Sequence, residues 1–148
     1  MFAGLETMAT TICNTLYALA LNPDCQESLY RELADIYPEP DSMTYENSKT
    51  CPMLDACLKE SQRLMPILSL MFRVAENPIE IKGVKIKAGD VVAIDVNGIH
   101  HNEEYWPSPN TFRPERFLEK EYKYVDDENS IFLPFGTGTR ILRTLSIG

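Results

Sequence analysis

The chain has 148 residues, of which 44% are hydrophobic and 24% charged, enough for one globular domain with a modest core. Its 14 basic and 22 acidic residues give a formal net charge of −8. This balance argues against nucleic acids and anionic membranes as partners, because both are bound through clustered Lys and Arg side chains. No apolar run approaches the roughly 18 residues of a spanning helix, so we expect no membrane span in this chain.

The chain contains four cysteines, and none forms a C-x-x-C pair. A zinc site is therefore not expected, and free buried thiols in a reducing compartment are the favoured interpretation. The residues after Met1 show no basic flank or cleavage pattern typical of a secretory signal. The cysteines are Cys13, Cys25, Cys51 and Cys57.

The first 66 residues predict three helices. Residues 2–21 have helical spacing of apolar side chains on nearly all sides, which is typical of a core helix. Asn22-Pro23-Asp24 interrupts that pattern, and an amphipathic helix is predicted over 25–37. A polar connector over 38–50 leads to a third predicted helix, 51–66, which Pro66 closes.

The pattern changes after Pro66. Short runs rich in β-branched residues predict strands in 68–75, 79–86 and 90–96, with a hairpin turn at Lys82-Gly83. A long irregular coil follows over 100–123. Because the helices precede the strands without alternating with them, the fold class is α+β, mainly α.

Two short motifs contain side chains with catalytic or pairing chemistry. Glu6 and Thr7 lie in the first helix, where a carboxylate and a hydroxyl could relay protons, although Thr7 could equally bond its own helix carbonyl. Glu60 and Arg63 lie three apart and can pair, yet an isolated surface pair contributes little to stability. Arg116, in the segment FRPERF, could fold back onto that pair.

Two other patterns argue against common ligands. Gly136-Thr137-Gly138 lacks the Lys of a phosphate-binding loop and the third glycine of a dinucleotide fingerprint. His100 and His101 are adjacent, so they point apart in a helix or strand and are poor joint metal ligands. We interpret His100 as a packed or capping residue.

These weak signals occur in an order that resembles the C-terminal third of a cytochrome P-450, the haem-thiolate monooxygenase family. AGLET resembles its Ala-Gly-x-Glu/Asp-Thr motif, KESQR its Glu-x-x-Arg helix, and FRPERF its Pro-Glu-Arg-Phe segment. FLPFGTGTR resembles the opening of its haem loop. The resemblance implies a partial cytochrome P-450 fold: the end of the central helix, two further helices, a small β-sheet, a meander coil and an incomplete haem loop.

The resemblance also implies residue roles around a haem, an iron protoporphyrin. Glu60, Arg63 and Arg116 would form a buried structural triad that locks a helix to the coil. Arg73 and Arg140 match positions that bind haem propionates, a task that suits paired guanidinium donors.

Three further roles concern the two faces of the haem. By the resemblance, Ala3 and Thr7 would lie over its distal face. Glu6 and Thr7 would deliver protons to bound dioxygen. Phe135 would pack near the proximal sulfur, so Ala3 and Phe135 join the two arginines as cofactor-binding candidates.

The family's iron ligand is absent from its expected place. Counting the haem-loop motif from Phe135 puts the cysteine at position 142 and a glycine at 144, where this chain has Leu142 and Thr144. Leucine cannot ligate iron, so the set of metal-ligating candidates is empty. Because the pattern stops abruptly and residues 141–148 depart from it, we expect a shifted reading frame, a retained intron or a splice variant.

Three interpretations of function stay open. In the first, the chain is a C-terminal fragment, 1–148, of a single haem-dependent monooxygenase domain. Such an enzyme inserts one oxygen atom of dioxygen into a small apolar substrate with electrons from NADPH through a reductase. In the second, it is an inactive truncated or splice product that acts through a partner or by weak haem binding. In the third, it is an α+β interaction module with accidental motifs.

The resemblance implies the endoplasmic reticulum membrane for a full-length parent. An apolar first helix without its usual cover predicts poor solubility.

Overall fold

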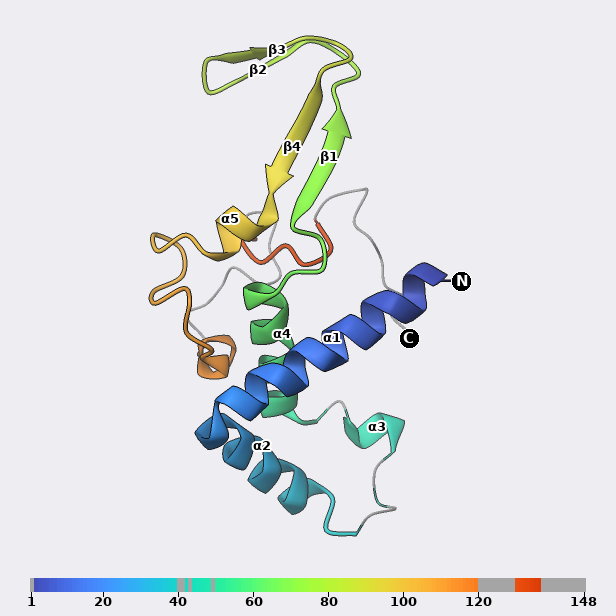
Figure 1. Ribbon diagram of the computed structural model, residues 1–148, viewed down its shortest axis with the longest axis vertical. Helices are drawn as coiled ribbons and strands as arrows, with labels where there is room; N and C mark the ends of the chain where they lie inside the picture. The colour runs from blue at the N-terminus through green and yellow to red at the C-terminus, as the bar shows by residue number, and fades with distance from the viewer. Residues whose placement is uncertain (1, 40–41, 43, 49, 120–129, 137–148) are drawn as a thin grey trace.

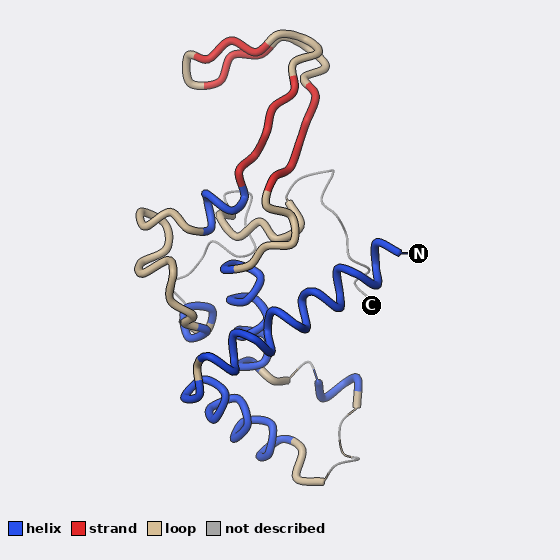
Figure 2. Tube along the Cα trace, viewed as in Figure 1, coloured by secondary structure: helices blue, strands red, loops and turns tan. Residues whose placement is uncertain are grey.

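The computed structural model describes residues 2–39, 42, 44–48, 50–119 and 130–136. Helices precede a pair of small antiparallel sheets, and the predicted mainly helical α+β class is confirmed (Figure 2). The elements are α1 (Phe2–Leu21), α2 (Pro23–Ile36), α3 (Tyr45–Ser48), α4 (Pro52–Leu64), β1 (Leu70–Val74), β2 (Ile79–Ile81), β3 (Val84–Ile86), β4 (Val91–Asp95), α5 (Val96–His100) and the 3₁₀ helix η1 (Pro114–Phe117).

Prolines mark where two of the three predicted helices begin. Pro23 opens α2 and Pro52 opens α4, since proline at the first helical position loses no intrahelical hydrogen bond. The predicted first and third helices are confirmed, as is the second, which begins at Pro23 rather than at Cys25. The short α3 lies in the segment predicted as a polar connector.

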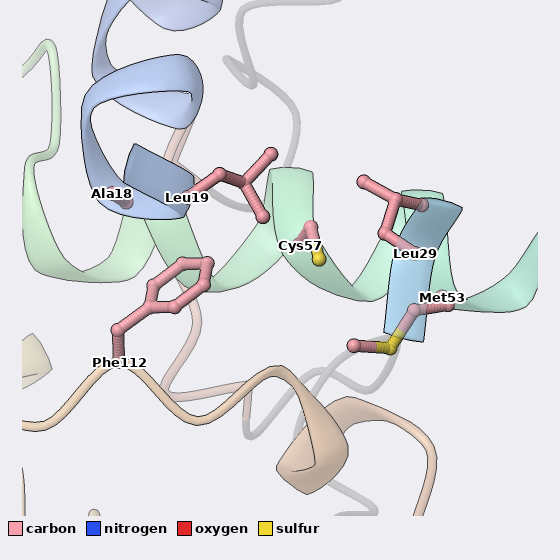
Figure 3. Close-up of a cluster of buried hydrophobic side chains, with 6 residues drawn as sticks. All are labelled: Ala18, Leu19, Leu29, Met53, Cys57 and Phe112. Carbon is pink, nitrogen blue, oxygen red and sulfur yellow. The ribbon is translucent and has the colours of Figure 1, made fainter. Parts of the chain in front are cut away.

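Helix α1 crosses α4, and the C-terminal end of α1 packs against α2 (Figure 1). The hydrophobic core forms where these three helices meet the coil before η1. A buried hydrogen bond of 2.7 Å between Thr15 Oγ1 and Ser61 Oγ joins α1 to α4 beside that core. The buried cluster, drawn in Figure 3, consists of Ala18, Leu19, Leu29, Met53, Cys57 and Phe112.

The opposite face of α1 is largely exposed in the described part of the chain. Leu5, Met8, Ile12 and Leu16 are each between 53% and 71% exposed. The expectation of a core helix buried on nearly all sides is therefore not met by the described residues, whereas the exposure agrees with the expectation of an apolar helix without its usual cover. The physical reason is geometric, because α2 and α4 both pack on one side of α1.

The two sheets each contain two antiparallel strands. β1 pairs with β4 in a register from Leu70↔Asp95 to Val74↔Val91. β2 pairs with β3 across a turn in which Lys82 and Gly83 have φ values of 47° and 83°, so the predicted hairpin is confirmed. Figure 1 shows this hairpin at the end of the β1–β4 ribbon, away from the helices.

The cysteines differ in burial. Cys51 and Cys57 are buried, Cys25 is half-buried, and Cys13 is exposed on α1. All four are free thiols, and burial raises the pKa of Cys57 to about 12, so this thiol stays protonated near neutral pH. Among the described residues, no helix has the length and apolar character needed to cross a membrane.

The exposed face of α1 generates a first prediction. The chain should self-associate at micromolar concentration, because a contiguous apolar patch of this kind promotes association. Replacing Leu5 and Ile12 together by lysine should shift the chain toward a monomer in analytical ultracentrifugation. The matched control is Gln26→Lys on α2, an exposed site, which adds charge without removing apolar surface. A monodisperse, cooperatively melting monomer without any substitution contradicts the prediction.

Candidate functional site

A carboxylate and two guanidinium groups meet in the interior between α4 and η1. Glu60 Oε2 accepts from Arg63 Nε at 2.8 Å, and Glu60 Oε1 accepts from Arg63 Nη2 at 2.9 Å. The same Oε1 atom accepts from Arg116 Nε at 3.1 Å and from the Arg113 backbone N–H at 2.9 Å. The side chains of Glu60, Arg63 and Arg116 are fully buried. The structure thus brings the three members of the expected triad together.

The remaining guanidinium donors bind backbone carbonyls of His100, the last residue of α5, and of the coil that leads to η1. Arg63 Nη1 donates to the His100 carbonyl at 2.7 Å, and Arg116 Nη1 donates to the Pro107 carbonyl at 3.2 Å. The two guanidinium carbons lie 5.3 and 6.0 Å from the centre of the buried Trp106 ring. One carboxylate faces two cations here, so carbonyl dipoles and the indole face supply the rest of the compensation.

His100, at the end of α5, links this cluster to residues 130–136. Its Nε2 accepts the Leu133 backbone N–H at 2.8 Å, and its ring stacks on Phe132 with centroids 5.6 Å apart. Burial and the nearby Arg63 charge lower the pKa of His100 to about 4. His100 is a packed residue, as the sequence indicated. Its bond to Leu133 was not foreseen, and no local spacing in the sequence signals it.

A cavity of about 190 Å³ joins the start of α1 to the last described segment. Two of the sequence-predicted site residues, Thr7 and Phe135, lie on its walls. Thr7 Oγ1 also donates to the Gly4 carbonyl at 3.2 Å, which is the helix bond considered above as an alternative. The lining residues are Thr7, Met8, Thr11, Ile12, Gln62, Ile67 and Phe135.

The other expected site residues lie away from this cavity or outside the described part. Glu6 is exposed on α1, and Arg73 is exposed on β1, where its Nη1 donates to the Phe72 carbonyl at 2.9 Å. Ala3 belongs to α1, but its side chain is outside the described part. Arg140 and Leu142 lie outside the described residues.

The triad generates a second prediction. Glu60→Gln should lower the free energy of unfolding by about 3–5 kcal/mol, because two buried guanidinium groups then lack their counter-charge. Urea denaturation followed by circular dichroism measures the change, and an unfolded chain without urea is the extreme form of the same result. The control is Glu27→Gln, which breaks the exposed pair with Arg31 and should cost less than about 1 kcal/mol. Equal effects of the two substitutions contradict the prediction.

Comparison of the sequence with known proteins identifies the family of the chain. The family model described as Cytochrome P450 matches residues 1–141. Lithocholate 6-beta-hydroxylase of Mesocricetus auratus is 36% identical over 140 residues, and Cytochrome P450 3A5 of Homo sapiens is 37% identical over the same number. In both cases the alignment covers 95% of this chain and 27% of the relative.

A third relative is shorter. Cytochrome P450 3A19 of Capra hircus aegagrus is 36% identical over 140 residues, which cover 95% of this chain and 63% of the relative. The chain therefore spans about a quarter of the length of the first two relatives and under two thirds of the third. Because the family model covers nearly all of the chain, and the relatives align over 95% of it, the chain belongs to the cytochrome P450 family.

Proposed function

We propose that the protein to which this sequence belongs is a haem-dependent monooxygenase. It inserts one atom of dioxygen into a small apolar organic substrate, with electrons from NADPH delivered by a reductase. The observation that carries this proposal is the cavity that brings Thr7 and Phe135, two residues of family motifs far apart in sequence, to one apolar space. By resemblance to the microsomal type of the family, we propose the endoplasmic reticulum membrane for a full-length parent.

The walls of that cavity are mostly apolar, but its volume of about 190 Å³ is too small for a whole haem. Aliphatic, thioether and aromatic side chains line it together with Thr7, Thr11 and Gln62, which suits contact with part of an apolar ligand. None of the four cysteines is among the lining residues. Leu142, at the position of the family cysteine, offers only carbon and hydrogen. The donor set of this chain therefore does not fit a haem-thiolate centre, and no catalytic step can be routed through one here.

The residue roles in this proposal differ in support. The locking role of Glu60, Arg63 and Arg116 rests on their buried contacts with one another and with the coil. Arg73 and Arg140 are proposed propionate partners.

Fewer structural contacts support the roles that are proposed near the distal face of the haem. Ala3 is a proposed haem contact, and Glu6 with Thr7 is the proposed proton-delivering pair. Thr7 has support from its place on the cavity wall, whereas Glu6 is exposed and does not line the cavity.

A second candidate function follows from Leu142. In this alternative the chain is catalytically inactive and acts, if at all, through a partner or by weak haem binding. The specific observation is that the sequence departs from the family pattern over 141–148, while the motifs before that point are intact. In either case, 1–148 is proposed to be part of one cytochrome P450 domain.

A third prediction separates the two candidates. The unsubstituted chain, titrated with haem, should show at most weak binding and no thiolate-type absorption in the reduced, carbon monoxide-bound form. Leu142→Cys should introduce that thiolate signature, because a thiolate then occupies the ligand position. The matched control is Ile141→Cys, which adds the same thiol one position away and should lack the signature. A Leu142→Cys variant without it favours the inactive chain.

A thiolate spectrum from the unsubstituted chain would instead show that another cysteine reaches the iron. Cys13 is the candidate to test in that case, because it is the exposed thiol on α1. Loss of the spectrum in Cys13→Ser would then identify it as the ligand and would contradict our assignment of position 142.

A further inference from the structure

Residues 130–136 are tied to α5 by one side chain. The Leu133 N–H donates to His100 Nε2 at 2.8 Å, a bond between residues 33 positions apart, and both residues are buried. Figure 1 shows this segment, in red, beside α5 and the base of the β1–β4 ribbon. The bond restrains the backbone of the segment directly, whereas packing of the Leu133 side chain alone would allow it to slide.

The chemistry of His100 shows that packing alone does not explain it. Since Nε2 accepts a hydrogen bond, the neutral ring carries its proton on Nδ1. Nδ1 has no hydrogen-bond partner among the described residues, and a buried donor without a partner costs free energy. A phenylalanine would stack on Phe132 without that cost. The imidazole therefore has a use that an apolar ring of similar size cannot supply, namely the acceptor at Nε2.

The position of Leu133 is transmitted to the cavity wall. The Leu133 side chain packs with Met71 and Val96, and its carbonyl accepts the Gly136 N–H at 3.2 Å. Gly136 has φ +82°, and a Cβ atom there would lie 3.0 Å from Met71 Sδ, so the turn fits closely against β1. Phe135 lies within this turn and lines the cavity opposite α1.

We propose that His100 is a positioning residue, whose Nε2 accepts the Leu133 backbone N–H and so sets where the 130–136 segment, with Phe135 on the cavity wall, lies against α5 and β1. This inference goes beyond the proposed function. Every atom it uses belongs to this chain, so it holds with or without a haem. In the sequence, the segment directly precedes the part of the haem-loop motif that contains Arg140 and position 142.

Burial and the charges around His100 keep Nε2 unprotonated, so the bond to Leu133 persists until the pH is well below neutral. Arg63 contacts the His100 carbonyl and disfavours a second positive charge, with Glu60 and Arg116 behind it in the same buried cluster. His101 adds a further positive charge when it is protonated. Protonation of Nε2 would also remove the acceptor. Because the pKa of His100 falls from 6.5 to about 4 in the folded chain, its contribution is complete above about pH 6.5 and is lost as the pH falls toward 4.

Two substitutions separate the acceptor from the ring. His100→Gln keeps an acceptor oxygen near the place of Nε2 but loses the ring, whereas His100→Phe keeps the stacked ring and loses the acceptor. Amide hydrogen exchange of peptides covering 130–136, measured by mass spectrometry on the full chain at pH 7, reports the bond. His101→Gln is the control, since within the described part of the chain His101 Nδ1 lies 3.0 Å from the Asn97 carbonyl of its own helix.

The expected order of protection is unsubstituted chain, then His100→Gln, then His100→Phe. Loss of the acceptor should speed exchange in 130–136 by roughly tenfold, the effect of one hydrogen bond. Peptides from α1 and α2 should exchange as in the unsubstituted chain, and so should all peptides of the control. A purely packing role puts His100→Phe first, the unsubstituted chain second and His100→Gln last, and that result overturns the proposal.

A pH series decides the matter if His100→Phe does not fold. Exchange in 130–136 is compared between the unsubstituted chain and His100→Gln at each pH, so that the intrinsic exchange rate cancels. The exchange rate of the unsubstituted chain divided by that of His100→Gln should rise as the pH falls from about 6.5 to 4. The reason is that only the unsubstituted chain has a titrating group at this position. A ratio that stays constant over that range overturns the proposal.

Discussion

The carboxylate of Glu60 holds α4 to the coil that follows α5. It accepts hydrogen bonds from Arg63, from Arg116 and from the Arg113 backbone, all in an interior without water contact. A carboxylate in such a place is costly unless its lone pairs are occupied, and here they are. The two arginines then have donors left over for carbonyls of the coil. One buried anion thereby organises an irregular stretch that has little regular backbone pairing of its own.

That organisation extends by steps to the cavity. Arg63 binds the carbonyl of His100, and His100 accepts from Leu133, so the arginine cluster and residues 130–136 share one residue of α5. Leu133 and Gly136 rest on Met71 of β1, which brings Phe135 to a space shared with Thr7. The cavity wall therefore depends on contacts with the buried cluster, although no member of the triad lines it.

Local sequence patterns predicted the features that depend on neighbouring residues, namely helix bounds and turns. The bounds of α1 and the turn at Lys82-Gly83 follow from periodicity and backbone preference, and both are as expected. The meeting of Arg116 with Glu60 was expected from the resemblance, since spacing alone could not join residues 56 apart. The His100–Leu133 bond was missed because a backbone donor carries no residue-type signal. The exposed face of α1 was expected from the resemblance and not from periodicity, because helical spacing does not reveal whether a partner covers an apolar stripe.

The intact cluster and the missing ligand are physically compatible. Among the described residues, the Glu60 carboxylate accepts from Arg63, Arg116 and the Arg113 backbone, and His100 Nε2 accepts from Leu133. The buried network around Glu60 thus consists of residues well before position 142 in the sequence. We therefore expect a substitution at position 142 to leave the hydrogen bonds of Glu60 in place. Substitutions at Glu60 should act in the opposite way, since they disturb the scaffold whatever residue occupies position 142.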